Sequence, residues 1–186
     1  HLSPLDAPAV LAHKMRDSGA KLVVTNNVGA LAQGAARLAD AGLADRVIVF
    51  EDEAFGAWPE TGPMPEGLAV TRWSDFVLDA GTPSPVALSP GDLALLQYTG
   101  GTTGMPKAAM LTHGNLSAAV SSYSLWYEHW GLTRPEPEKV LVYLPLFHIY
   151  GLSAVLLRSL KAGNLCQLRL RFDAAAALDE IEAGAN

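Results

Sequence analysis

Residues 21–50 read KLVVTNNVGALAQGAARLADAGLADRVIVF and hold two short apolar runs on either side of a helical pattern. The runs at 21–25 and 47–50 are continuous and rich in valine, which is typical of strands buried on both faces. The segment between them has apolar residues at helical spacing, with Asn27 as a candidate cap and Gly42 as a stop. This strand–helix–strand order predicts an α/β fold with mainly parallel sheets covered by helices.

The chain on both sides of this unit continues the alternation. The same patterns predict a helix that starts at Asp6 and Pro8 and ends at Gly19, strands at 93–98 and 108–111, a helix from Thr112 to Gly131, a strand at 140–144, a helix at 149–160, a strand at 165–170 and a helix from Asp173 to Glu182. Residues 56–91 hold 11 of the chain's 29 Gly and Pro residues, so a surface connection with a short helix at 73–80 is expected there. We therefore divide the chain into an α/β part at 1–91 and a second at 92–186.

The composition excludes several classes of protein. Apolar residues make up 49% of the 186, enough for a core, and the single Cys166 cannot form an internal disulfide. The net charge of −6 lies wholly in residues 1–92, and such an acidic chain does not resemble a nucleic-acid binder. Residues 140–157 carry no formal charge but include Pro145 and Gly151, so a strand, a turn and a helix are expected rather than a membrane span. With no signal peptide visible, we expect a cytoplasmic protein.

Residues 99–107 read TGGTTGMPK and carry the residue types that bind polyphosphates. Three glycines let backbone N–H groups approach a ligand, three threonines add hydroxyl donors, and Lys107 adds a positive charge. Between residues 93 and 127, Lys107 is the only residue with a formal charge. A hairpin without a ligand needs only one or two glycines, so a phosphate-binding loop is the better interpretation.

Other well-known site patterns do not fit. The P-loop pattern has Ser or Thr directly after its lysine, where this chain has Ala108. The G-x-G-x-x-G dinucleotide pattern, the zinc-site patterns H-E-x-x-H and C-x-x-C, and the esterase pattern G-x-S-x-G are absent from the sequence. The loop also joins two predicted strands rather than a strand and a helix.

The loop belongs to a longer motif that resembles a known family. Residues 98–107, YTGGTTGMPK, resemble the AMP-binding signature of the adenylate-forming superfamily, and residues 144–151, LPLFHIYG, resemble the next motif of the same enzymes. Further similarity at 17–21 and 171–173 extends the resemblance over nearly the whole chain. It implies a partial copy of the large N-terminal α/β domain of these enzymes.

The resemblance also implies an activity. Gly100, where many members have Ser, and the MLTHGN run at 110–115 are similar to bacterial long-chain fatty acyl-CoA synthetases. Such an enzyme activates a carboxylic acid, here a long-chain fatty acid, as acyl-AMP and then transfers it to CoA. ATP, Mg²⁺ and CoA are the implied cofactor and co-substrates. No nucleic acid is implied as a partner, and peripheral contact with a membrane is compatible with such a substrate.

The motif match implies roles for single residues. The phosphates of ATP would be held by Thr99, Gly100, Gly101, Thr102, Thr103, Gly104 and Lys107. Thr102, or the threonine after it, would touch Mg²⁺, and Lys107 and His148 would act in catalysis. His148 would orient the substrate carboxylate, Tyr150 would pack on the acyl group, and Arg171 would lie near the CoA phosphates. From the residues alone, His148 and Tyr150 also fit a place in the core, and Arg171 fits a surface cation.

Two alternatives stay open at this point. An adenylating enzyme for aryl or amino acids would share the chemistry and differ only in its acid pocket. The other alternative is an isolated nucleotide-binding fragment without turnover, because the family's downstream motifs and its C-terminal domain are not found in the sequence. The 186 residues are about a third of what the resembling enzymes use, so we expect a fragment whose open sheet edges favour self-association.

Overall fold

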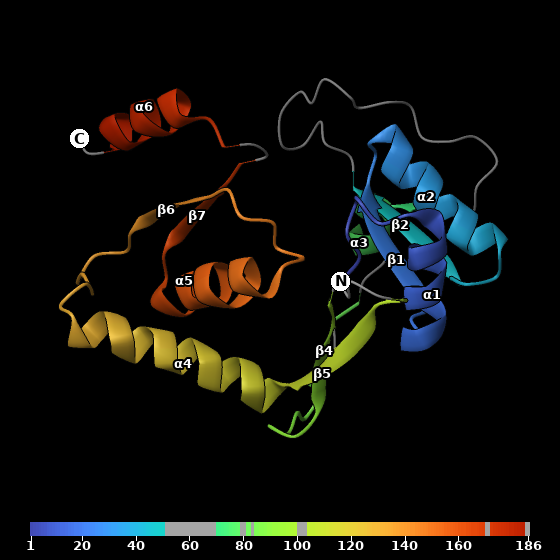
Figure 1. Ribbon diagram of the computed structural model, residues 1–186, viewed down its shortest axis with the longest axis horizontal. Helices are drawn as coiled ribbons and strands as arrows, with labels where there is room; N and C mark the ends of the chain where they lie inside the picture. The colour runs from blue at the N-terminus through green and yellow to red at the C-terminus, as the bar shows by residue number, and fades with distance from the viewer. Residues whose placement is uncertain (51–69, 79–80, 83, 100–103, 170–171, 185–186) are drawn as a thin grey trace. The chain divides into compact units, whose positions relative to one another are not determined.

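The protein forms two compact units in the computed structural model (Figure 1), which describes residues 1–50, 70–78, 81–82, 84–99, 104–169 and 172–184. One unit holds Leu2–Ala87 and Tyr98–Ala108, and the other holds Leu88–Gln97 and Ala109–Asn186 together with His1. The segment Tyr98–Ala108 is therefore grouped with the N-terminal part of the chain rather than with its sequence neighbours. The division into domains at residue 91 stays a prediction.

The N-terminal unit is built around a three-stranded parallel sheet. Its elements are α1 (Pro8–Ser18), β1 (Leu22–Asn26), α2 (Gly29–Asp40), β2 (Arg46–Phe50), β3 (Val70–Arg72) and α3 (Trp73–Leu78). The strand order is β1-β2-β3, with Val23 opposite Val47 and Val47 opposite Val70. This parallel strand–helix–strand arrangement confirms the predicted α/β fold.

Strand β2 is buried on both of its faces. Val47, Ile48 and Val49 are each at most 1% exposed, and successive side chains of a strand point to opposite faces. On one face, the two valines pack with Met15 of α1 and Leu38 of α2 in the main apolar cluster. The apolar run of β2 therefore has the burial that its sequence predicts. For β1 this prediction is wrong, because Leu22 and Val24 are 44% and 48% exposed and only Val23 is buried.

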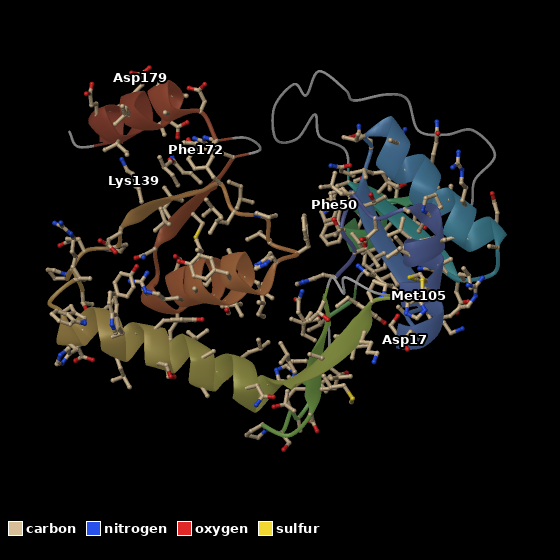
Figure 2. The ribbon with its side chains drawn as sticks, in the orientation of Figure 1. Asp17, Phe50, Met105, Lys139, Phe172 and Asp179 are labelled. Carbon is tan, nitrogen blue, oxygen red and sulfur yellow. The ribbon has the colours of Figure 1, made fainter. Side chains whose placement is uncertain are left out.

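Strand β3 and helix α3 lie in the segment expected to be a surface connection. The helix was predicted there, but the strand was not, because three residues next to a Gly- and Pro-rich stretch give no periodicity to detect. Phe50 lies at the end of β2 (Figure 2). Trp73 of α3 stacks on this ring with 4.2 Å between ring centroids. This aromatic contact attaches α3 to the sheet.

The second half of the chain contains two further strand pairs and the longest helix. Its elements are β4 (Leu93–Thr99), β5 (Lys107–Thr112), α4 (His113–His129), β6 (Lys139–Val142), the π-helix η2 (Gly151–Leu157), α5 (Arg158–Ala162), β7 (Leu165–Leu168) and α6 (Ala174–Gly184). Strands β6 and β7 pair in parallel, and α5 lies between this pair and α4 (Figure 1). Among the described residues, no helix combines the length and apolarity that crossing a bilayer requires.

Several helix ends follow their predicted signals. Gly19 and Gly131 have φ angles of +64° directly after α1 and shortly after α4, a left-handed conformation that glycine adopts without strain. At the start of α6, Asp173 Oδ1 accepts a hydrogen bond from the Ala176 N–H at 2.8 Å. These three boundaries confirm the predictions made from cap residues.

The prediction that Asn27 caps helix α2 is wrong. Helix α2 begins at Gly29, and Val28 occupies the capping position without a side-chain hydrogen bond. The Asn26 side chain instead accepts a hydrogen bond from the Val28 N–H at 3.3 Å. Asn27 therefore lies one residue too early in the chain to cap the helix.

Helix α4 begins with a reciprocal cap that the sequence predicts at Thr112. Thr112 Oγ1 accepts from the Asn115 N–H at 3.1 Å, and Asn115 Oδ1 accepts from the Thr112 N–H at 3.0 Å. We expect Thr112→Ala to lower the free energy of unfolding by about 1 kcal/mol, because one orphan N–H loses its partner. Urea denaturation measures this change, with the exposed mid-helix variant Ser117→Ala as the control. Equal stabilities of the two variants would contradict the capping role.

Candidate functional site

The predicted phosphate-binding loop lies between two paired strands. β4 and β5 form a two-stranded sheet, and the seven residues between them are too few for a parallel crossover, so the pair is a hairpin. Thr99, the last residue of β4, donates from its hydroxyl to the carbonyl of Lys107, the first residue of β5, at 3.3 Å. The structure thus brings together the two predicted phosphate ligands at the ends of the loop.

Four of the predicted phosphate ligands, Gly100, Gly101, Thr102 and Thr103, lie outside the described residues. The next one, Gly104, has a φ of +102°. L-residues with a side chain rarely adopt this backbone conformation, so the chain needs a glycine at this position. The loop residue types therefore match local backbone geometry where the structure describes it.

The donor set of the hairpin suits a polyphosphate. The Lys107 side chain is exposed, and no other residue from 93 to 127 carries a formal charge that would neutralise it. The Lys107 ammonium is a donor that phosphate oxygens accept from, and the Thr99 hydroxyl becomes one when it turns away from the Lys107 carbonyl. The predicted Mg²⁺ contact at Thr102 lies outside the described residues, and the described part of the chain has no group of three or more His, Cys, Asp or Glu side chains that could hold a metal ion.

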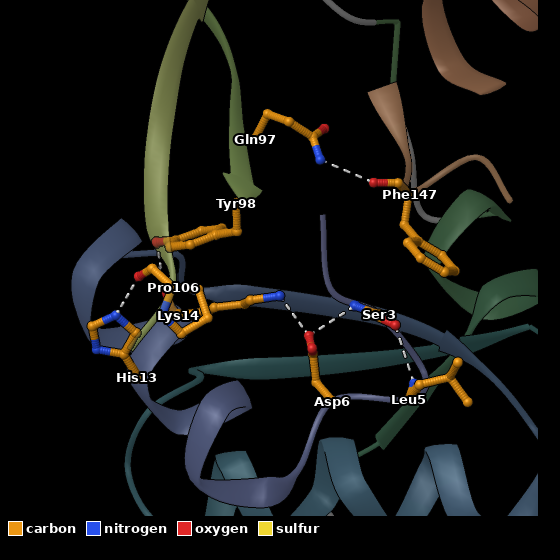
Figure 3. A network of polar contacts seen from close by, with 9 residues as sticks. All are labelled: Ser3, Leu5, Asp6, His13, Lys14, Gln97, Tyr98, Pro106 and Phe147. Carbon is orange, nitrogen blue, oxygen red and sulfur yellow. Dashed lines mark hydrogen bonds and ion pairs between the residues drawn. The ribbon is translucent and has the colours of Figure 1, made fainter. Parts of the chain in front are cut away.

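The two ends of the loop between β4 and β5 are tied to helix α1. The sequence did not indicate these contacts. The Tyr98 hydroxyl lies 2.7 Å from Asp17 Oδ2. It also lies 3.2 Å from the Lys14 carbonyl (Figure 3). At the other end of the loop, just before β5, His13 Nε2 lies 2.9 Å from the carbonyl of Pro106. This carbonyl can only accept, so the nitrogen carries a proton. Burial, together with the hydrogen bond to Asp17, raises the pKa of Tyr98 to about 12. The phenol therefore remains a donor at neutral pH.

The second motif, residues 144–151, forms a separate cluster of contacts. Gln97 Nε2 donates to the carbonyl of Phe147 at 3.1 Å, which ties β4 to the residue before His148 (Figure 3). His148 is exposed, and its Nδ1 accepts from the Tyr150 N–H at 3.3 Å, so Nε2 is the protonated nitrogen of the ring. The Tyr150 side chain is 57% exposed. Both predicted substrate-binding side chains are therefore open to solvent in the described structure.

Gly151 closes this motif by a close approach to Pro145. A Cβ atom at Gly151 would lie 2.6 Å from the Pro145 carbonyl oxygen, too short for any side chain. The same oxygen accepts a hydrogen bond from the His148 N–H at 3.1 Å, which shapes the turn that carries the histidine. Gly151 also begins η2, where an α-helix was predicted; π-helical turns are frequent at functional sites.

The predicted CoA contact, Arg171, lies outside the described residues. The chain next to it is described: Phe172 packs edge-on against Tyr143 with 5.2 Å between ring centroids. Arg169 pairs with Glu180 of α6 at 2.8 Å, so this arginine is engaged within the protein.

Comparisons with known proteins agree with the geometry. The family described as AMP-binding enzyme matches residues 2–184. A 4-coumarate–CoA ligase from Pinus taeda is 32% identical over 180 residues, which cover 97% of this chain and 30% of that protein. A long-chain-fatty-acid–CoA ligase from Bacillus subtilis is 46% identical over 82 residues, covering 44% of this chain and 14% of that protein.

Solved structures show the same likeness. The crystal structure of ATP-bound MatB from Rhodopseudomonas palustris is 25% identical, with a TM-score of 0.70, over 98% of this chain and 32% of that one. The chain thus spans about 30% of the length of the relatives that it matches. On the family match and the hairpin geometry together, this chain belongs to the AMP-binding enzymes, the adenylate-forming superfamily, with acid–CoA ligases among its relatives.

Proposed function

We propose that the protein containing this chain is an ATP-dependent acid–CoA ligase. The substrate carboxylate attacks the α-phosphorus of ATP, which forms acyl-AMP and releases pyrophosphate. The CoA thiolate then attacks the acyl carbon, which forms the thioester and releases AMP. The observation that carries this proposal is the hairpin that joins Thr99 to the exposed Lys107, the only residue with a formal charge between residues 93 and 127.

The first step needs stabilisation of the charge that develops on the leaving pyrophosphate. Fixed donors aimed at that charge are the largest single contribution in such reactions. We assign this role to the loop residues Thr99, Gly100, Gly101, Thr102, Thr103, Gly104 and Lys107, with Mg²⁺ held through Thr102. His148 donates from Nε2 to the carboxylate, Tyr150 packs on the acyl group, and Arg171 pairs with CoA phosphates. ATP and CoA are cytoplasmic metabolites, so we place the reaction in the cytoplasm.

For the acid we propose a long-chain fatty acid. The fatty-acid ligase relative is 46% identical over its shorter match, against 32% for the 4-coumarate ligase over almost the whole chain. The match to the 4-coumarate ligase is the longer one, so an aryl acid is the second candidate. The acid pocket itself decides between the two.

A panel of acids tests this proposal on the full-length protein that contains these residues. Palmitate, 4-coumarate and an amino acid are each supplied with ATP, Mg²⁺ and CoA, and mass spectrometry measures the thioester. We expect palmitoyl-CoA in the greatest amount. Preferential formation of 4-coumaroyl-CoA would replace the fatty acid with the aryl acid, and no thioester with any acid would contradict the ligase.

The 186-residue chain alone is a second test of the same proposal. It spans about 30% of its relatives, so we expect it to bind ATP weakly and to form no acyl-AMP. Acid-dependent exchange of labelled pyrophosphate into ATP measures this activity. Exchange by the 186-residue chain would show that it holds a complete catalytic site.

A further inference from the structure

Helix α1 contacts the chain at both ends of the loop between β4 and β5. The hydroxyl of Tyr98 in β4 lies 2.7 Å from the Asp17 carboxylate. The carbonyl of Pro106, just before β5, accepts from His13 (Figure 3). The two helix residues are four apart in sequence, so they lie on one face of α1. A single rigid helix therefore holds both ends of the loop.

The anchored residues are the direct neighbours of two proposed phosphate ligands. Tyr98 precedes Thr99, and Pro106 precedes Lys107. Thr99 also donates a hydrogen bond to the carbonyl of Lys107, so the two anchored ends of the loop contact each other. A displacement of α1 would therefore displace both ligands.

The phenol of Tyr98 is held from more than one side. Its hydrogen bond to the Asp17 carboxylate, at 2.7 Å, is short and charge-assisted. The buried ammonium of Lys14 lies 5.3 Å from the centroid of the Tyr98 ring and pairs with Asp6 at 2.6 Å. Asp6 in turn accepts from the Ser3 N–H at 3.1 Å, so the anchor continues into the chain before α1.

An anchor of this kind matters because a two-stranded hairpin is only marginally stable by itself. Ordering the two ends of a binding loop at the moment of binding costs conformational entropy, and ends that are fixed beforehand avoid part of that cost. We propose that His13 and Asp17 are positioning residues that hold the hairpin ready for the pyrophosphate end of ATP. This inference rests on the proposed function, since it assigns the ligand of the same loop.

Kinetics of the full-length protein test the inference with conservative changes. Tyr98→Phe removes one hydroxyl and keeps the ring, and Asp17→Asn removes the charge that accepts from it. We expect each to raise the KM for ATP about tenfold, the usual effect of losing a hydrogen bond to a charged group, while the KM for the acid stays within about twofold. Tyr123→Phe and Asp45→Asn are the matched controls, and neither should change the KM for ATP.

The histidine side of the anchor offers a rescue experiment. His13→Ala should raise the KM for ATP, and His13→Gln should restore it, because the glutamine amide nitrogen can donate to the same carbonyl. An equal rise of both KM values together with a lower melting temperature would show a merely structural role and overturn the inference. An unchanged KM for ATP in all of the variants would overturn it as well.

A measurement without substrate separates this inference from the proposed function. Hydrogen exchange of the amides at 104–110 reports on the order of the hairpin whether or not the protein is a ligase. We expect faster exchange in Tyr98→Phe and His13→Ala than in Tyr123→Phe. Unchanged protection would contradict the claim that α1 holds the hairpin. Faster exchange in a protein that shows no acid-dependent adenylation would support that claim and would overturn only the assignment of ATP as the ligand of the hairpin.

Discussion

Replacing Lys107 with alanine in the full-length protein should lower acid-dependent ATP–pyrophosphate exchange by about 10²–10³-fold, the usual effect of removing one donor to a developing charge. Lys107 is exposed at the start of β5, and it is the only formal charge in the 35 residues from 93 to 127. Loss of this ammonium leaves the leaving pyrophosphate without a cation from this part of the chain. Pyrophosphate exchange at saturating acid measures the effect.

Two further variants give this experiment its controls. Lys107→Arg keeps the charge and should keep part of the exchange, although a guanidinium differs in geometry from an ammonium. Lys21→Ala removes an exposed lysine whose nearest acidic partner, Asp45, lies 3.9 Å away, and it should leave the exchange unchanged. Wild-type exchange in Lys107→Ala would remove the pyrophosphate role of this residue.

Gly151→Ala should lower the free energy of unfolding by about 1–3 kcal/mol, the range for overpacking a buried site. The new Cβ would lie 2.6 Å from the Pro145 carbonyl oxygen, which is backbone and cannot rotate away. Either Pro145 moves, which shifts the turn that carries His148, or η2 moves. Thermal or urea denaturation measures the loss, and the same variant in the full-length protein should raise the KM for the acid.

The matched control for this variant is Gly34→Ala. Gly34 lies within helix α2, its φ is not positive, and a Cβ there has no atom within 4 Å. Alanine in a helix is favoured over glycine, so Gly34→Ala should raise the free energy of unfolding by up to about 1 kcal/mol. Equal effects of the two substitutions would contradict the close approach at Gly151.

Much of the fold could be predicted from local signals. The valine runs of β1 and β2, the cap at Thr112 and the stop at Gly19 all depend on residues within a few positions of one another. The failures have equally local causes. Strand β3 is too short to show a period, and the true start of α2 lies two residues past Asn27.

The site was predictable only in its sequence-local part. Thr99 and Lys107 belong to one motif, so the roles that we propose for them rest on a single stretch of sequence. The contacts that hold this stretch come from far away in the chain. His13 is 93 residues before Pro106, and Asp17 is 81 residues before Tyr98, so no periodicity or spacing could pair them. Tertiary structure alone brings α1 to the two ends of the loop.

We propose that the carboxylate of an acid attacks the α-phosphorus of ATP bound at this hairpin. The most direct test supplies the full-length protein with ATP, CoA and an acid labelled with ¹⁸O in both carboxylate oxygens. The oxygen that attacks phosphorus stays with AMP when the thiolate takes the acyl group, so we predict AMP that carries one ¹⁸O and unlabelled pyrophosphate. Formation of ADP with ¹⁸O in orthophosphate would place the attack at the γ-phosphorus and contradict the account.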